Sequence, residues 1–431
     1  MPHPTALSDH DVQPTTPRPA LSYPWLVVGM LWWISFFNYA DRQAIASVFP
    51  LLKAEMHLTD TELGLLGSAF AWVYGLSAPL AGVIVDRLRR KTAILGGLQV
   101  WSVICLATAL ARKFPHLLIF RAAEGLGETV YYPASTALIS DYHGPRTRSR
   151  ALGIHQTSVY VGTIAGGAFA GLIGELYGWR WSFIVFGGLG MVLGFVLLRF
   201  LREPQRGAAE DDLTNSRPLS LADVGRLIVR TPTVLLLMLA FACANFVAIV
   251  LLTWMPTFLK EHFDLSLAVA GFAATVFVQF ASMVGAPLGG WLADRWRRRT
   301  PAGRILVQVM GVLGGAPFVF LCGQADSVAW LIPILTAWGL FKGCYDANIF
   351  AAVFDVVPPE ARGRVAGVMN MAGWLGGGGA AVVVGFLADR YGLGPAIGST
   401  AAVYVLAGGL LLIAAVGRQR GMVRMHAEVK G

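Results

Sequence analysis

"APLAGVIVDRLRRK" (Ala78–Lys91) decides the fold because it returns 208 residues later as "APLGGWLADRWRRR" (Ala286–Arg299). A second stretch, "DYHGPRTRSRALG" (Asp141–Gly153), returns 214 residues later as "DVVPPEARGRVAG" (Asp355–Gly367). The two signals follow each other in the same order in both halves of the chain. Such a repeat predicts two bundles related by an axis along the membrane normal, with a binding site between them.

The composition excludes a large soluble protein. Of the 431 residues, 55% are hydrophobic and 14% are charged, whereas about 25% are charged in an average soluble domain. A helix of about 20 apolar residues crosses a bilayer. We therefore predict an all-α polytopic membrane protein, in which twelve transmembrane helices form two pseudo-symmetric six-helix bundles. The predicted spans are 25–51, 61–85, 92–111, 115–140, 150–174, 181–201, 232–258, 266–292, 304–323, 328–354, 364–388 and 396–417.

The positions of lysine and arginine predict the orientation, because these residues are retained on the cytoplasmic side. With the N-terminus inside, 25 of the 34 lie in inside segments, 6 in outside segments and 3 within spans. Both termini are therefore expected to be cytoplasmic. The formal charge of +9 then reflects topology and contact with anionic headgroups, and gives no reason to expect a nucleic-acid partner. Compact loops favour a bacterial inner membrane.

The segments between the apolar runs predict the domain boundaries. The first run is too long for the core of a cleavable signal peptide. Polar residues separate the halves, and "SLADVGRLIVR" within them is expected to form a surface helix. The predicted parts are a disordered cytoplasmic tail (1–22), a first bundle (23–202), a cytoplasmic linker (203–230), a second bundle (231–418) and a second cytoplasmic tail (419–431).

The loop after the second predicted span resembles the signature of the major facilitator superfamily. In that signature a glycine is followed, after three residues, by Asp-Arg and a basic cluster, here Gly82, Asp86 and Arg87 with Arg90 and Lys91. Arg89 and, in the second copy, Arg297 stand where many members have a second glycine. The resemblance extends over nearly the whole chain and implies a transporter that works by alternating access.

Two subfamilies share further motifs with this chain. "FNYADR", "RAAEGLGE", "LISDY" and "REPQRG" resemble the spinster lipid transporters. "NYADRQ", "GWRWSF" and the loop 146–150 resemble the anion:cation symporters of organic and sugar acids. The resemblance implies that the signature loops close the cytoplasmic side in one conformer. This gating role falls to Gly82, Asp86, Arg87, Gly290, Asp294 and Arg295, the two glycines allowing close helix contact; topogenic charge alone is the alternative.

Seven ionisable residues are expected inside the membrane, where each unpaired charge would cost about 2.5 to 3.5 kcal/mol. Three of them recur at i, i+3 and i+7 and share a helix face, and two more are at i, i+4. A rise of 1.5 Å per residue places the seven at a similar depth. They are Asp41, Arg42, Arg121, Glu124, Glu128, Lys342 and Asp346.

The charged residues predict a proton switch. Neighbouring residues on a helix point about 100° apart, so Asp41 and Arg42 cannot both face one helix. We expect Arg42 to pair with Glu128 or to contact an anionic substrate. We also expect Asp41 or Glu128 to take up a proton when that pair opens, because burial favours a neutral carboxyl group whereas an arginine favours the charged form. Glu124 and Asp346 are further proton-coupling candidates. A static ion pair between helices is the alternative.

The remaining binding candidates follow from position and residue type. Arg42, Arg121 and Lys342 favour an anionic substrate, and Gln156 is a candidate for contacting substrate oxygens. His155 is interpreted as a hydrogen-bonded structural residue, with proton relay as the alternative. About half of the aromatic residues in the central spans are expected to line a cavity, the rest being packing residues. These candidates are Tyr39, Tyr131, Tyr132, Trp254, Tyr345 and Trp374.

The sequence favours a secondary transporter over a membrane enzyme or a transporter-like sensor. It has no nucleotide-binding GxxxxGK[ST] motif, and its four cysteines lack metal-ligand spacing and are interpreted as packing residues. We expect neither cofactor nor metal, and a monomer by resemblance. The predicted activity is proton-coupled symport of a small organic anion. The alternative is a spinster-like transporter of lysophospholipid or another amphipathic anion.

Overall fold

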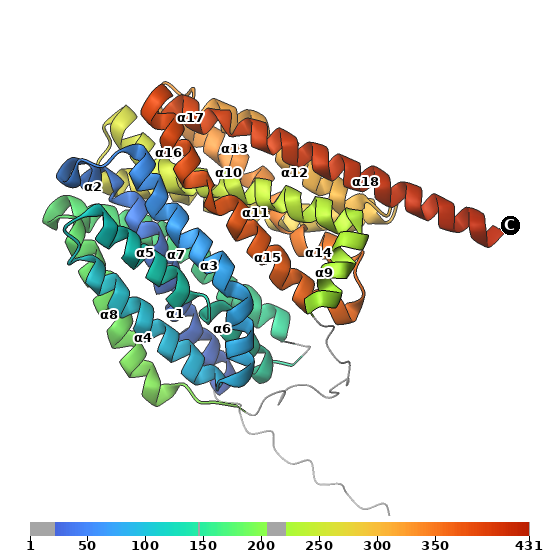
Figure 1. Cartoon of the computed structure of the whole chain (residues 1–431), viewed down its shortest axis with the longest axis horizontal. Coiled ribbons are helices and arrows are strands. Elements are labelled where there is room, and N and C mark those ends of the chain that lie inside the picture. The colour runs from blue at the N-terminus through green and yellow to red at the C-terminus, as the bar shows by residue number, and fades with distance from the viewer. Residues whose placement is uncertain (1–21, 145–146, 205–220, 431) are drawn as a thin grey trace, which may run out of the picture.

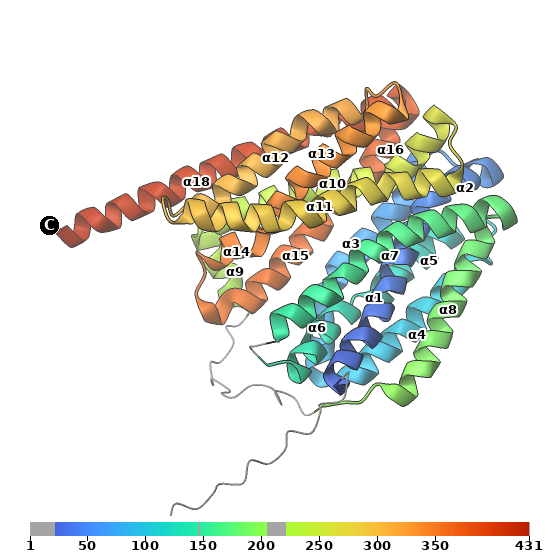
Figure 2. The same cartoon turned by 180° about the vertical axis from the view of Figure 1, so that it is seen from behind.

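The structure, a computed structural model, describes residues 22–144, 147–204 and 221–430. These residues form eighteen α-helices and one short 3-10 helix. Figures 1 and 2 show two helical bundles, one built from α1–α8 and the other from α10–α18, which we call the N-half and the C-half. The prediction of an all-helical membrane protein made of two bundles is confirmed.

The helices of the N-half follow the predicted spans closely. They are α1 (Tyr23–Ser47), α2 (Phe49–Met56), α3 (Asp60–Arg87), α4 (Arg90–Thr108), α5 (Phe114–Glu128), α6 (Tyr131–Tyr142), α7 (Arg148–Tyr177) and α8 (Trp179–Phe200). The helix α9 (Leu221–Arg230) forms inside the predicted linker. Residues 205–220 of that linker, and residues 1–21 of the predicted N-terminal tail, are outside the described residues.

The C-half repeats the pattern, with short breaks within its last three spans. Its helices are α10 (Pro232–Phe263), α11 (Leu267–Arg297), α12 (Gly303–Cys322), α13 (Val328–Asp346), α14 (Ile349–Phe354), the 3-10 helix η1 (Pro359–Ala361), α15 (Arg362–Gly378), α16 (Ala380–Tyr391), α17 (Leu393–Ser399) and α18 (Ala401–Lys430). The last helix continues through the residues predicted to form the C-terminal tail.

Ten helical segments of the described chain are long and apolar enough to cross a membrane by length and composition. The two predicted spans missing from this set are α1 and the pair α5–α6. The helix α1 carries Asp41 and Arg42. The α5–α6 segment carries three charges in α5 and Asp141 in α6, and it is interrupted at Thr129 and Val130. The spans that fall short on apolar character are thus the ones that hold the buried charges.

One ion pair occurs once in each half and confirms the repeat in three dimensions. Arg90 pairs with Asp141 in the N-half. In the C-half, Arg304 Nη1 lies 2.9 Å from Asp355 Oδ1. Both residues of the second pair stand 214 positions after those of the first. The repeat offset therefore changes from 208 on α11 to 214 on α12; these two helices are joined by residues 298–302, whereas α3 and α4 are joined by residues 88–89.

The two halves meet at one end of the molecule and diverge toward the other (Figures 1 and 2). We call the first the paired end; it holds α2, the starts of α3 and α11, and the end of α16. The other is the terminal end, where α1 begins and α18 ends. Within the described residues, the hydrogen bonds between the halves join the paired end and the adjoining middle of the bundle. They include Gln43 Nε2 to the Leu252 carbonyl at 2.9 Å and the Val382 amide to Ser68 Oγ at 3.1 Å.

Glycines set the closest helix contacts. A Cβ at Gly162 would lie 2.5 Å from the Phe36 carbonyl oxygen, and one at Gly166 would meet the backbone of Ala40, so α1 is held directly against α7. The prediction of a close contact at Gly290 is wrong, because a Cβ there would meet nothing within 4 Å. On this helix Gly285 and Gly289 make close backbone contacts with α13, and Gly271 makes one with Gly167 of α7.

Candidate transport site

The predicted pairing of Arg42 with Glu128 is confirmed. Arg42 Nε lies 2.5 Å from Glu128 Oε2, and the side chains are 11% and 0% exposed. The bond joins α1 to α5 at the level where α5 ends. Because both charges are removed from water, each depends on the other for most of its stabilisation.

Aromatic rings surround the Arg42 guanidinium, whose central carbon lies 4.8 Å from the ring centroid of Tyr39, 5.1 Å from that of Phe70 and 4.6 Å from that of Tyr74. Trp374, at 5.5 Å, belongs to α15 in the other half. Ring faces attract a guanidinium electrostatically, most strongly where water is excluded. Arg42 therefore contacts both halves. Tyr39 and Trp374 were predicted to line the site, whereas Phe70 and Tyr74 were missed.

A second ion pair lies beside the first on α5. Arg121 pairs with Glu124 one turn along the helix, with side chains 3% and 0% exposed. The Arg121 guanidinium also lies 4.8 Å from the ring centroid of Phe70, which therefore contacts both arginines. All three predicted charges of α5 are buried on one helix face, as their spacing predicted.

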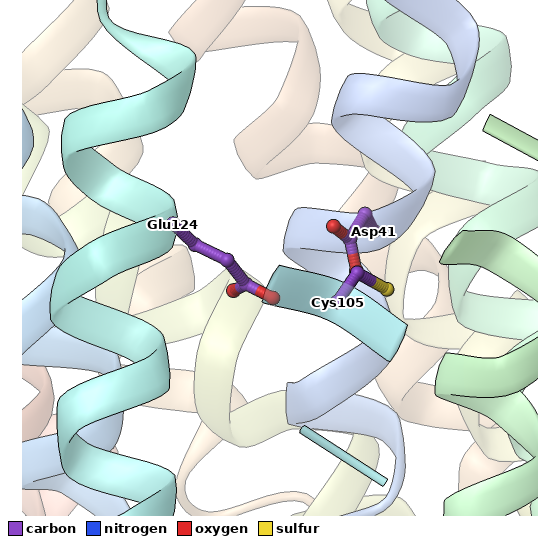
Figure 3. Close-up of side chains that lie close together, drawn as sticks. All are labelled: Asp41, Cys105 and Glu124. Atoms are coloured by element: carbon purple, nitrogen blue, oxygen red, sulfur yellow. The ribbon is translucent and has the colours of Figure 1, made fainter. Parts of the chain in front are cut away.

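Asp41 lies beside Cys105 of α4, with Glu124 of α5 nearby (Figure 3). The Cys105 thiol of α4 donates to Asp41 Oδ1 at 3.1 Å. A ligand atom from each of Asp41, Cys105 and Glu124 lies within 4.8 Å of the others. This spacing would suit a metal ion, but the Arg121 guanidinium bound to Glu124 opposes a cation here. Cys105 was predicted to be a packing residue; its position within an apolar run gave no signal of this contact.

The cluster carries more acids than bases. Three carboxyl groups, Asp41, Glu124 and Glu128, face two guanidinium groups, those of Arg42 and Arg121. Asp41 Oδ2, Glu124 Oε1, Glu128 Oε1 and Arg42 Nη1 are buried without a hydrogen-bond partner in the described part of the chain. Because an uncompensated buried negative charge is costly, the cluster is suited to hold a proton.

The predicted Lys342–Asp346 pair of α13 is also present. Its side chains are 15% and 36% exposed, so this pair is more exposed to solvent than the N-half cluster. Tyr160 of α7 lies within electrostatic range of both residues, although it belongs to the other half. Glu128 and Lys342 are related by the repeat offset of 214, but each is paired within its own half.

The structure separates the other candidates into two groups. Tyr132 is 40% exposed and Gln156 is partly exposed, as a lining role requires. Trp254 and Tyr345 are buried at 0% and 3% exposure, which identifies them as packing residues. Tyr131 is also buried.

The Tyr131 hydroxyl donates to the Leu31 carbonyl at 2.7 Å and lies 3.0 Å from Nε2 of the buried His155. This contact favours the structural interpretation of His155.

The predicted gating residues whose side chains the structure describes do not connect the halves in this conformer. Arg87 and Arg295 are exposed at the terminal end. Asp294 Oδ1 lies 3.4 Å from Arg304 Nη2 of its own half. Asp86, like Gly82, lies on α3, and its side chain is outside the described part of the structure. The gating role of these residues therefore stays a prediction.

Comparison with known proteins finds the superfamily that the sequence motifs resemble. The family profile described as Major Facilitator Superfamily matches residues 31–381. Protein spinster homolog 1 of Homo sapiens is 29% identical over 85% of this chain and 73% of its own length. The hexuronate transporter of Bacillus subtilis is 25% identical over 90% and 92%, and the D-galactonate transporter of Escherichia coli is 27% identical over 88% and 92%.

A solved structure shares the fold. The crystal structure of a bacterial homolog of the human lysosomal transporter Spinster, described as inward-facing and unoccupied, superposes with a TM-score of 0.82 at 22% identity. The match covers 94% of this chain and 99% of the other. The family profile spans most of the chain, and the fold is that of its transporters. This chain therefore belongs to the major facilitator superfamily, as a multi-pass membrane transporter and not an enzyme.

Proposed function

We propose that this protein is a proton-coupled symporter of a small organic anion. The observation that carries the proposal is the buried Arg42–Glu128 pair, in contact with Trp374 of the opposite half. Because this pair contacts both halves, a change in the protonation of Glu128 alters an interaction at the interface that must open and close. The relatives named as hexuronate and D-galactonate transporters support an organic acid as substrate.

Substrate and Glu128 compete for the same cation in this mechanism. When Glu128 is ionised it occupies Arg42, and when it takes a proton its attraction for the guanidinium falls sharply. The carboxylate of a substrate can then replace it on Arg42. Because protonation improves anion binding, anion binding improves protonation by the same factor. Proton and anion therefore bind together, which is the requirement for symport.

The neighbouring charged residues provide further places to hold a proton or to bind the anion. Asp41, which accepts from Cys105, and Glu124, which pairs with Arg121, provide a second place where a proton can be held inside the N-half. Lys342 and Asp346 provide a partly exposed pair in the C-half. Arg121 and Lys342 are the further cations for a polyfunctional anion. Tyr132 and Gln156 are proposed to contact its uncharged part.

The charge distribution sets the proposed orientation. The terminal end carries the arginine-rich loops, so we place it, and both chain termini, in the cytoplasm of a cell with this protein in its inner membrane. The paired end then faces outward. In this orientation the conformer described here is closed to the outside and open toward the cytoplasm.

An amphipathic anion such as a lysophospholipid is the second candidate. Leu76 and Leu80 of α3 are 63% and 64% exposed, and they lie on the same helix as Gly75, whose Cβ position is 3.0 Å from Trp374. An acyl chain could follow these leucines while its headgroup reached Arg42. Spinster homolog 1 is among the relatives, and this supports the candidate.

Uptake into proteoliposomes tests the proposal, after a thermal-stabilisation screen of sugar acids, simple carboxylates and lysolipids has chosen the substrate. An imposed proton gradient should drive accumulation by the wild-type protein. Glu128→Gln and Asp41→Asn should abolish gradient-driven uptake while retaining counterflow exchange. Gradient-driven uptake that survives both substitutions would contradict the proton switch. Stabilisation by lysolipids alone would favour the second candidate.

A further inference from the structure

Two acidic residues near the paired end occupy equivalent places in the two halves. Glu175 closes the stretch "GLIGE" (171–175) at the end of α7, and Asp389 closes "GFLAD" (385–389) at the end of α16. The two stretches are 214 positions apart, which is the offset of the internal repeat. Each has a glycine one helical turn before the acid.

Asp389 caps a helix of the opposite half. Its Oδ1 accepts from the Asp60 amide at 2.9 Å, and its Oδ2 accepts from the Thr61 amide at 3.0 Å and from the Thr61 hydroxyl at 2.5 Å. The first amides of a helix have no partner inside it. The capping box of α3, formed by Thr59 and Glu62, satisfies two other donors. The carboxylate of Asp389 therefore completes the N-terminus of α3.

Glu175 makes the reciprocal contact. Its Oε2 accepts from the Leu267 amide, the first of α11, at 3.1 Å, while Ser266 accepts from the Val269 amide. Leu267 follows Asp60 by 207 positions, and the N-caps Ser266 and Thr59 are separated by the same number. Each half thus supplies one carboxylate to a helix start of the other half.

The glycines explain how these helices come close enough. A Cβ at Gly385 would meet the Asp60 backbone, and a Cβ at Gly171 would meet the Leu267 backbone. The two contacts are equivalent under the repeat. A glycine allows the approach, and an acid one turn later binds the helix start, where the helix dipole favours negative charge.

A third bridge lies at the same end. Lys53 Nζ of α2 lies 2.7 Å from Asp60 and 3.1 Å from Glu261 of the C-half. Partial burial disfavours the charge of Lys53, but its hydrogen bonds and attraction to these two acids outweigh that effect and raise its pKa. Among the residues that the structure describes, this bridge has no symmetric counterpart, so the paired carboxylate caps are the repeated element.

We propose that Glu175 and Asp389 are gating residues of the paired end, each holding the start of a helix in the opposite half. Alternating access requires this end to separate. The three amides and one hydroxyl that donate to these carboxylates would then donate to water instead. A contact made in only one conformer shifts the population by its differential free energy, so these caps favour the conformer in which the paired end is closed. The inference rests on the transporter fold and on no particular substrate.

The distance between the halves at the paired end tests this proposal. Spin labels introduced as noncanonical amino acids at Arg112 and Asp326, exposed positions in the α4–α5 and α12–α13 connections, report it by pulsed electron resonance without substrate. Glu175→Gln and Asp389→Asn should each raise the population of the separated form about fivefold. The double variant should raise it further. Glu62→Gln, which alters the capping box of α3 but no contact between halves, is the matched control and should leave the population near that of the wild type.

Two outcomes would overturn the proposal. One is an unchanged distance distribution in the double variant. The other is an equal shift in the Glu62→Gln control. If an acid variant does not yield folded protein, Gly171→Ala and Gly385→Ala test the same contacts from the neighbouring turn and should separate the halves in the same direction. Because the measurement uses neither substrate nor a proton gradient, its failure would leave the symport proposal intact.

Discussion

Arg42 makes contacts that depend on a planar guanidinium, because one edge binds Glu128 while its faces meet aromatic rings. A lysine has the same charge but no planar group for stacking. Arg42→Lys should therefore lower uptake about tenfold or more, since desolvated cation–π contacts contribute about 2 kcal/mol. Arg390→Lys is the matched control, because Arg390 lies 4.0 Å from the Phe386 ring centroid and is exposed, far from the site. Full uptake by the Arg42 variant would show that charge alone is sufficient.

Cys105 is the residue whose predicted role changed most. Its thiol donates to Asp41, and a donor of this kind stabilises the charged carboxylate. In Cys105→Ala the carboxylate should hold its proton to higher pH, so the pH dependence of uptake should move upward by about 0.5 to 1 unit. Cys105→Ser keeps a donor and should retain the wild-type profile. Equal profiles for alanine and wild type would return Cys105 to a packing role.

At the scale of helices, α1 carries the site and is positioned by glycine contacts. A methyl group at Gly166 would meet the backbone of Ala40, next to Asp41. Gly166→Ala should lower the midpoint of thermal unfolding in detergent by several degrees, since overpacking costs about 1 to 3 kcal/mol, and should reduce uptake. Gly153→Ala on the same helix meets nothing within 4 Å and should leave the midpoint unchanged. If both variants melt alike, the α1–α7 contact is more adaptable than the geometry indicates.

Helix periodicity explains which parts of the site could be predicted. The charges of α5 share a face because i, i+3 and i+7 positions align on any helix, and Lys342 meets Asp346 for the same reason. Phe70 and Tyr74 were missed because α3 is apolar all round, so its sequence has no polar face to show how the helix is rotated in the bundle. Cys105 was missed because one thiol among apolar residues has no distinguishing spacing.

At the scale of the whole molecule, the repeat predicted the two halves but not the conformer. One sequence must encode both the closed and the separated paired end, so no pattern within it indicates which contacts are made in a given state. The equivalence of Glu175 and Asp389 became visible only once both were seen at helix starts of the opposite half. The signature loops, by contrast, were predicted from sequence, although their described side chains do not connect the halves in this conformer.

When two rigid halves move against each other, closing one end opens the other. A contact that closes the paired end and a contact that closes the terminal end must therefore shift the population of the separated form in opposite directions. In this conformer Asp389 binds α3 across the paired end, whereas the ion pair of Asp294 within the described residues is with Arg304 of its own half. If Asp294 stabilises the other conformer, Asp294→Asn should lower the separated population at the Arg112–Asp326 label pair by about fivefold, the inverse of Asp389→Asn. The two sites lie at opposite ends of the C-half, so their effects should add. The Asp294→Asn/Asp389→Asn double variant should therefore return the distance distribution close to that of the wild type. If both single variants shift the separated population in the same direction, Asp294 is not a gating residue and its loop has a topogenic role.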